Sequence, residues 1–363
     1  MDINRFSKKI VSRFDLFFWE KIGRFRYVKK MAKMRAKVVG KGALNSDQKR
    51  EIAKVWGNKY NNSRYLKLYS NYLSSGKDHK LADYIPDDYY MDKVEPFFNK
   101  PLIARKNEDK NLYDLFFGDI TMPRTILRYV DGVFMDAAYN LMTKETALKM
   151  CQQYDEVIIK TASESGGGHG ITFWNRNESL ADLEKRIKKG DNMIVQELVK
   201  QHPEMSRLHE SSINTLRIMT VMFEGQVHVM THFVRMGVKG KRVDNVSSGG
   251  MLCGINRDGT LFETGYDEHG KPYLSHPTSG TVFKGFKVPA YDKCIELVTK
   301  VAPRLSHFAK LISWDVAVTQ DGEPLLIEAN LTYCDIGIYQ IACGPVFGSG
   351  EIKDRILSTI AKV

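Results

Sequence analysis

Cysteine is sparse in this chain, and long apolar runs are missing. The 363 residues contain five widely scattered cysteines without a Cys-x-x-Cys pair, which is typical of a reduced compartment rather than of a disulfide scaffold. No apolar run reaches the roughly 18 residues of a membrane-spanning helix, and the N-terminus lacks an apolar stretch leading to a small-residue cleavage site. We therefore expect a cytoplasmic protein that is neither secreted nor embedded in a membrane.

The basic charge is concentrated at one end of the chain. Residues 1–60 hold 17 Lys and Arg against 5 Asp and Glu, a net charge of +12, whereas the other 303 residues hold 37 basic and 38 acidic side chains. The main body is therefore close to neutral. No zinc-finger spacing or aromatic RNA-binding signature accompanies the basic segment, which argues against nucleic acid as a partner.

Apolar side chains recur at steps of three or four within this basic segment. They are Ile3, Phe6, Ile10, Phe14, Phe17, Phe18, Ile22, Phe25, Val28 and Met31. The spacing predicts a basic amphipathic helix, or two helices separated near Gly23. Two interpretations remain open: the aromatic stripe packs on the body of the protein, or it attaches the protein to an anionic membrane at the inner face of the cell membrane.

Strand patterns dominate the chain after a proline-interrupted region from Tyr84 to Leu148. We predict strands at 157–160, 170–174, 193–198, 215–222, 227–235, 311–319 and 324–330, and helices at 180–189 and 290–308. This mixture indicates an α/β (α+β) protein. We divide the chain into a basic helical segment (1–82), a middle region (83–197) and a C-terminal region (198–363).

An acidic hairpin near the C-terminus is the most specific signal. Asp321-Gly322 between two apolar runs predicts a two-residue turn with positive φ at both positions. Asp315 then lies opposite Glu328, with Cβ atoms about 5 Å apart, and Asn330 follows on the same face. Facing carboxylates repel unless a cation compensates them, and carboxylate and amide oxygens are ligands that magnesium takes. The hairpin therefore predicts a Mg²⁺ site, with Ile312, Trp314, Val316 and Val318 on the core side.

A lysine followed by a glycine cluster gives a second signal. Lys160 ends a short apolar strand, and Gly166, Gly167, Gly168 and His169 follow it. Consecutive glycines let backbone amides approach anionic oxygens, and the lysine adds positive charge. The segment is not a Walker A loop, because the motif Gly-x-x-x-x-Gly-Lys-Ser/Thr is missing. We interpret it as a hairpin flap over phosphates, with His169 as a phosphate contact.

Taken in order, these motifs resemble the ATP-grasp superfamily over about residues 105–345. The resemblance implies two α/β lobes with ATP between them. Residues 83–197 would contain a pre-grasp region and the N-terminal lobe, and residues 198–363 would form the C-terminal lobe with the metal site. It also implies residue roles. Lys110 and Lys160 would hold the ATP phosphates, the hinge Gln196, Glu197, Leu198 and Val199 would contact adenine, and Asp315, Glu328 and Asn330 would hold Mg²⁺.

Three further stretches narrow the resemblance. Residues 212–217, 243–250 and 314–318 resemble the sugar-transfer-associated ATP-grasp family, which accompanies polysaccharide and capsule biosynthesis. One position departs from many ATP-grasp ligases, which have an arginine two residues after the metal-binding asparagine, where this chain has Thr332. Arg217 and Arg235 are the candidates for the missing catalytic cation, beside Lys160, if their strands place both side chains on one face.

The resemblance implies an ATP-dependent ligase that activates a carboxylate as an acylphosphate and joins it to an amine. The substrates would be small or glycan-linked carboxylates and amines. Two alternatives stay open: a kinase that phosphorylates a sugar or alcohol hydroxyl, and a non-catalytic nucleotide-binding partner of a glycan assembly complex.

Overall fold

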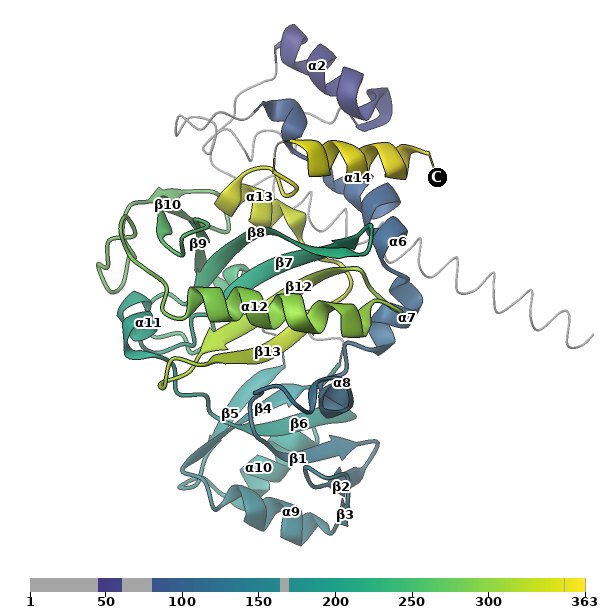
Figure 1. Cartoon of the computed structure of the whole chain (residues 1–363). Coiled ribbons are helices and arrows are strands. Elements are labelled where there is room, and N and C mark those ends of the chain that lie inside the picture. Colours follow the sequence, from purple (N-terminus) through teal and green to yellow (C-terminus); the bar gives the residue numbers. More distant parts are fainter. Residues whose placement is uncertain (1–44, 61–79, 164–169, 349, 363) are drawn as a thin grey trace, which may run out of the picture.

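The computed structural model describes residues 45–60, 80–163, 170–348 and 350–362 (Figure 1). The predicted basic helix and the predicted flap residues Gly166, Gly167, Gly168 and His169 lie outside the described residues. Within the described part, the strands form two sheets in which every strand pair is antiparallel. Within the same ranges, no helix combines the length and apolar character needed to cross a bilayer.

Six strands form the smaller sheet, in the spatial order β3-β2-β1-β6-β4-β5. They are β1 (Thr125–Val130), β2 (Val133–Met135), β3 (Leu141–Met142), β4 (Glu156–Thr161), β5 (Ile171–Asn175) and β6 (Asn192–Glu197). Helices α9 (Lys144–Cys151) and α10 (Leu180–Ile187) cover one face, where their apolar side chains meet Val157 and Ile159. Because side chains alternate along a strand, Ile158 and Lys160 face the other way.

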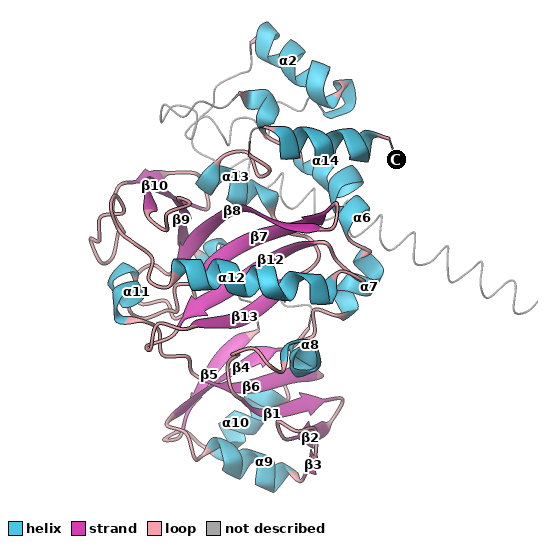
Figure 2. Ribbon diagram, viewed as in Figure 1, coloured by secondary structure: helices cyan, strands magenta, loops and turns pink. Residues whose placement is uncertain are grey.

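Seven strands form the larger sheet, in the order β11-β10-β9-β8-β7-β12-β13. They are β7 (Leu216–Phe223), β8 (Gln226–Met236), β9 (Met251–Ile255), β10 (Leu261–Asp267), β11 (Pro272–Tyr273), β12 (Leu311–Val318) and β13 (Pro324–Asn330). Helix α12 (Tyr291–Val301) lies across one face of this sheet (Figures 1 and 2).

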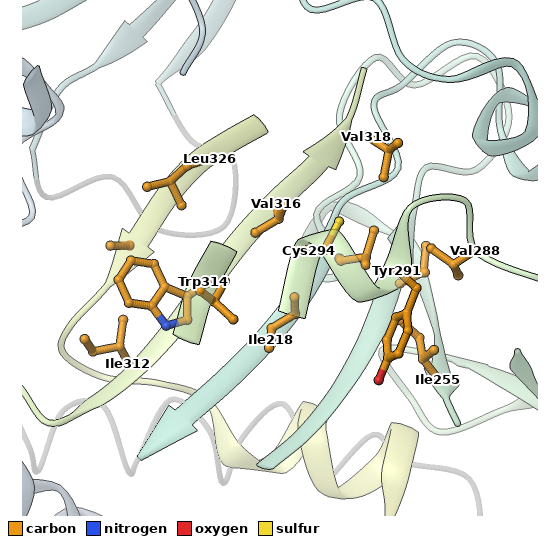
Figure 3. Close-up of a cluster of buried hydrophobic side chains, with 14 of the residues drawn as sticks. Ile218, Ile255, Val288, Tyr291, Cys294, Ile312, Trp314, Val316, Val318 and Leu326 are labelled. Atoms are coloured by element: carbon orange, nitrogen blue, oxygen red, sulfur yellow. The ribbon is translucent and has the colours of Figure 1, made fainter. Parts of the chain in front are cut away.

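The core beneath α12 contains the side chains that the sequence assigned to the core side of the hairpin. Ile312, Trp314, Val316 and Val318 are all buried there with Leu326 and residues of α12 (Figure 3). The indole nitrogen of Trp314 donates to the Thr220 hydroxyl at 2.8 Å, so its polar atom is satisfied inside the core. The alternate residues of β12, including Asp315, therefore face away from α12.

The opposite face of the large sheet is covered by α13 (Ile336–Cys343) and by helices from both ends of the chain. These are α2 (Ser46–Trp56), α5 (Asp87–Tyr89), a π-helical turn (Tyr90–Val94), α6 (Glu95–Phe98) and α14 (Glu351–Ala361). Helix α7 (Pro101–Lys106) instead places Ala104 in the core on the α12 side. The remaining helices are α8 (Tyr113–Phe117) and α11 (Pro203–Leu208). Short 3-10 turns occur at Asn58–Tyr60, Leu81–Asp83, Lys110–Leu112, Val246–Ser248 and Ala302–Leu305.

The seven strands predicted from the sequence all form, with ends within one residue of the predicted ends. Strands β1, β2, β3, β9, β10 and β11 were not predicted. The helix expected over 290–308 ends at Val301 and continues as a 3-10 turn, since Pro303 has no amide hydrogen to continue the helical hydrogen bonds. The helix expected over 180–189 ends at Ile187.

Candidate active site

A cavity of about 800 Å³ lies between the two sheets and takes side chains from both. The small sheet contributes Ile158 and Lys160 of β4 and Ile171 and Phe173 of β5. The large sheet contributes charged and polar residues of β7, β8, β12 and β13, which are Arg217, Arg235, Asp315, Glu328 and Asn330. Residues far apart in the sequence therefore meet in one cavity, as the ATP-grasp resemblance implied.

Lys160 projects into the cavity from the small sheet. Only 8% of the residue is exposed, and its ammonium group donates to the side-chain oxygen of Gln196 at 3.1 Å. Burial, together with the nearby charge of Lys110, lowers the pKa of Lys160 to about 8. The lysine therefore begins to lose its proton not far above neutral pH. An anion bound beside it would stabilise the charged form.

The predicted hinge lies along the same wall. Glu197, Leu198 and Val199 line the cavity, whereas Gln196 is buried behind them and bonds Lys160. Strand β6 ends at Glu197, so Leu198 and Val199 lie just beyond the small sheet. Gln196 thus orients the lysine, a contact that the sequence did not predict.

The segment 108–113 contacts β13 and the two residues after it at three places. Lys110 forms an ion pair with Glu328 at 2.7 Å, and the Tyr113 hydroxyl accepts from the Ala329 amide at 3.0 Å. The Glu108 carboxylate accepts from the amides of Leu331 and Thr332 at 2.6 and 2.7 Å. The first lysine of the predicted pair is therefore buried against the predicted metal ligand rather than free at the surface.

Glu108 is a cavity residue that the sequence reasoning missed. Burial raises the pKa of its carboxyl to about 7, although the hydrogen bonds from Leu331 and Thr332 oppose that rise. Its partner Thr332 occupies the position where many ATP-grasp ligases have arginine. In this chain a carboxylate and a hydroxyl meet at that position (Glu108 to Thr332 hydroxyl, 3.0 Å), so it supplies no cation.

Arg217 and Arg235 supply positive charge on the large sheet. Asp315 pairs with Arg217 across β12 and β7, and its two oxygens accept from the Arg217 Nε and Nη2 atoms at 2.7 and 2.6 Å. Arg235 reaches the same carboxylate at 3.1 Å. Both arginines therefore lie on the cavity face, which is the condition that the sequence set for their role as the substitute cation.

Asp315 itself is 1% exposed. Burial alone would raise the pKa of its carboxyl, but Arg217 and Arg235 outweigh that effect and hold the pKa below its usual value. The carboxylate is thus ionised inside the protein and serves as the shared counter-ion of two guanidinium groups.

A second ring of polar groups surrounds this pair. Arg235 donates to the Thr215 hydroxyl at 3.0 Å and to the Asn245 side chain at 3.3 Å, and it lies 3.4 Å from Asp244. Asp244 also accepts from the amide of Thr215 at 3.2 Å. Thr215, Asp244 and Asn245 belong to two of the stretches that carried the family resemblance, 212–217 and 243–250, but their contacts with Arg235 could not be derived from spacing.

The hairpin brings Asp315 opposite Glu328 and Ser313 opposite Asn330, as predicted. The predicted two-residue turn is wrong: only Gly322 has a positive φ (75°), and the Thr319 amide bonds the Glu323 carbonyl at 2.9 Å. The loop is therefore one residue longer. A bulge at Ile327 offsets the difference, because Val316 pairs with Leu326 while Asp315 pairs with Glu328.

The donor chemistry of the hairpin fits magnesium, with two carboxylates and an amide on one cavity face. The part of the chain that the structure describes contains no group of three His, Cys, Asp or Glu residues arranged for a metal. The charge compensation that the sequence assigned to a metal comes here from Arg217, Arg235 and Lys110.

The fold and the cavity define an α/β protein with a strongly charged site between two antiparallel sheets. Residues 89–351 match the family described as sugar-transfer associated ATP-grasp. The match covers most of the chain, and the chain therefore belongs to this family, as the sequence motifs indicated. No relative is found among curated proteins.

Solved structures with a similar fold include three ligases. D-alanyl-alanine synthetase A from Vibrio cholerae is 12% identical, with a TM-score of 0.41, over 72% of this chain and 66% of its own. L-amino acid ligase from Bacillus licheniformis is 12% identical, with a TM-score of 0.40, over 70% and 49%. The ATP-grasp ligase PsnB, complexed with minimal precursor, Mg and ADP, is 13% identical, with a TM-score of 0.41, over 73% and 62%.

The chain thus spans about half to two thirds of the length of these structures. At these TM-scores the similarity defines neither a reaction nor a substrate for this chain.

Proposed function

We propose that this protein is an ATP-dependent ligase that joins a carboxylate to an amine in the synthesis of a polysaccharide such as a capsule. The observation that carries the proposal is the meeting of Lys110 and Lys160 with the Arg217, Arg235 and Asp315 cluster in one cavity of about 800 Å³. Such a cavity provides cations for phosphates at one wall and for an anionic acceptor at the other. The family name supports the connection with sugar transfer.

In this proposal ATP binds between the lobes, along the small-lobe wall of the cavity. Lys110 and Lys160 hold the phosphates, and the hinge residues Glu197, Leu198 and Val199 border the adenine. Burial lowers the pKa of Lys160, and a phosphate beside it would offset this effect, because a neighbouring negative charge favours the charged ammonium. The lysine therefore becomes fully protonated when the nucleotide is in place.

The large lobe then binds the acceptor carboxylate beside Arg217 and Arg235. A carboxylate oxygen attacks the γ-phosphorus, the bond to ADP breaks, and an acylphosphate forms. The amine attacks the acyl carbon, loses a proton, and displaces phosphate to leave an amide. The guanidinium and ammonium groups are fixed in advance by Asp315, Thr215 and Gln196, and they stabilise the charge that develops on the transferred group.

Glu328 and Asn330, together with Asp315, are the residues that would hold Mg²⁺. When bound, Mg²⁺ supplies charge neutralisation at the phosphate oxygens. Lys110, which pairs with Glu328, links this end of the hairpin to the small lobe.

The products of the reaction test the proposal. The full chain would be incubated with ATP, Mg²⁺ and a pool of amino acids and nucleotide sugars, and the mixture would be analysed by mass spectrometry. A ligase gives ADP, free phosphate and a condensed product whose mass is the sum of two pool members less one water. Phosphorylated sugar without free phosphate would show a kinase instead, and no ATP turnover with any acceptor would contradict both.

A further inference from the structure

The loop 237–250, which joins β8 to β9 in the large sheet, contacts the small lobe through Arg242. The two terminal nitrogens of Arg242 donate to the two oxygens of Glu156 at 2.7 and 2.6 Å. Its guanidinium carbon lies 3.7 Å from the centre of the Phe173 ring. Glu156 begins β4 and Phe173 lies in β5, so a single side chain is held by two strands of the opposite lobe.

The same loop also holds the arginine of the large lobe. Asp244, two residues after Arg242, accepts from the Thr215 amide at 3.2 Å and lies 3.4 Å from Arg235. Asn245 accepts from Arg235 at 3.3 Å. A displacement of the loop would therefore move the partners of Arg235, which is one of the two groups that hold Asp315.

The start of the loop is fixed to the large lobe. The imidazole of His209 is 2.6 Å from the Lys239 carbonyl, and that of His276 is 2.8 Å from the Gly237 carbonyl. A Cβ atom on Gly237 would come within 2.7 Å of the Ser212 hydroxyl, so glycine is required for this close approach. With one end fixed, motion between the lobes acts on the part of the loop around Arg242.

The contact of Arg242 is suited to form and break. The side chains of Arg242 and Glu156 are 40% and 27% exposed, and an ion pair of this exposure is weakened by water and salt. The stack on Phe173 adds a modest attraction and fixes the plane of the guanidinium group. Phe173 and Ile171 of β5 line the cavity wall to which we assign the nucleotide. A bound nucleotide would therefore contact the same strand that holds Arg242.

We propose that Arg242 is a positioning residue that couples closure of the small lobe over the nucleotide to the placement of Arg235 and Asp315. The inference rests on the proposed function, since it requires that ATP binds between the lobes. It goes beyond that function by assigning the coupling to one ion pair and one stack outside the reacting groups.

Hydrogen exchange tests the coupling without any reaction. The full-length protein would be compared with and without a non-hydrolysable ATP analogue and Mg²⁺. In the wild type, the analogue should slow exchange both at the hinge 196–199 and in the loop 240–248. In Arg242→Ala the hinge should keep this protection, whereas the loop should lose it. Glu156→Gln, which alters the partner on the other lobe, should give the same pattern.

Arg176→Ala provides the matched control. Arg176 pairs with Asp155 at 3.0 Å, next to Glu156 in sequence, but both partners belong to the small lobe. This variant should leave loop protection unchanged. The double variant E156R/R242E restores the ion pair with its charges exchanged and should regain at least half of the lost protection.

Steady-state kinetics give a second readout. Arg242→Ala should lower kcat about tenfold, or raise the KM of the acceptor by a similar factor, while the KM of ATP stays within about twofold. Loop protection in Arg242→Ala equal to that of the wild type, or no recovery in the double variant, would overturn the coupling. Absence of hinge protection in the wild type would instead show that the nucleotide site itself is wrong, and would overturn the proposed function together with this inference.

Discussion

Asp315 lies directly opposite Arg217 on neighbouring strands, and both of its carboxylate oxygens accept hydrogen bonds from that one guanidinium group. Arg235 approaches the same carboxylate from the next strand but one. A buried carboxylate between two arginines is costly to disturb, since removal of one partner leaves the others charged and without compensation. The structure therefore ties Asp315 to the stability of the fold as well as to the candidate site.

Asp315→Asn should therefore destabilise the protein as well as inactivate it. We expect a loss of about 3 kcal/mol or more in the free energy of unfolding, because two buried guanidinium groups lose their shared counter-ion. Denaturant titration followed by circular dichroism measures this loss. A variant with wild-type stability would show that water or another acid replaces Asp315.

Glu328→Gln should separate function from stability. Glu328 is more exposed than Asp315, with 23% of its side chain accessible, and its partner Lys110 can remain near the amide. We expect ATP turnover below about a tenth of wild type, because the substitution removes a charged ligand, with a smaller loss of stability than Asp315→Asn causes, because only the ion pair with Lys110 is removed. A normally folded variant with nearly full turnover would contradict the metal assignment.

Lys160→Ala should weaken ATP binding in calorimetric titration, because the variant lacks the buried ammonium on the small-lobe wall. Lys160→Arg should bind ATP but react poorly, because a planar guanidinium cannot reproduce a compact ammonium group. Affinity of the alanine variant equal to that of the wild type would show that this strand-end lysine does not contact the nucleotide.

Nucleotide binding should also take up a proton above neutral pH. The pKa of Lys160 is about 8 in the free protein, so most of its ammonium groups are deprotonated at about pH 9. Phosphate raises that pKa, and the complex then holds a proton that the free protein lacks. Titrations in buffers of different ionisation enthalpy should show uptake of most of one proton at about pH 9, little at about pH 7, and none at either pH in Lys160→Ala.

Removal of residues 1–40 tests the role of the basic segment. These residues precede α2, so truncation leaves the described elements intact. If the segment binds an anionic membrane, at about 1 kcal/mol for each Lys or Arg near the surface, truncation should release the protein from anionic vesicles at low salt while ATP binding stays unchanged. Insolubility of the truncated protein, with no vesicle binding by the full chain, would show that the segment packs on the body instead.

Regular alternation explains why part of the fold could be predicted. Strand β4 has Val157 and Ile159 toward the helices and Lys160 toward the cavity, a pattern of period two that sequence alone reveals. Strand β1 was missed because Arg128 interrupts its apolar pattern. This arginine is fully buried, and its charge is satisfied by Asp114 and two backbone carbonyls that no local pattern indicates.

The sequence indicated the cavity residues whose positions follow from strand patterns, and it missed the one whose position depends on tertiary contacts. The order of Lys160, Asp315, Glu328 and Asn330 is visible in the sequence because these residues end strands or alternate along them. Glu108 was missed, since it acts through backbone amides of a segment more than two hundred residues away. Such a contact depends on how the whole chain packs, so no local sequence pattern indicates it.

The bulge at Ile327 changes what a single strand can offer. In plain alternation two consecutive residues face opposite sides, yet Ile327 and Glu328 both line the cavity. One strand therefore presents an apolar side chain and a carboxylate side by side on the same wall of the cavity. Because Ile327 is left out of the ladder, its deletion would leave Asp315 opposite Glu328 and Val316 opposite Leu326, so this residue changes the wall of the cavity without changing the pairing of the two strands.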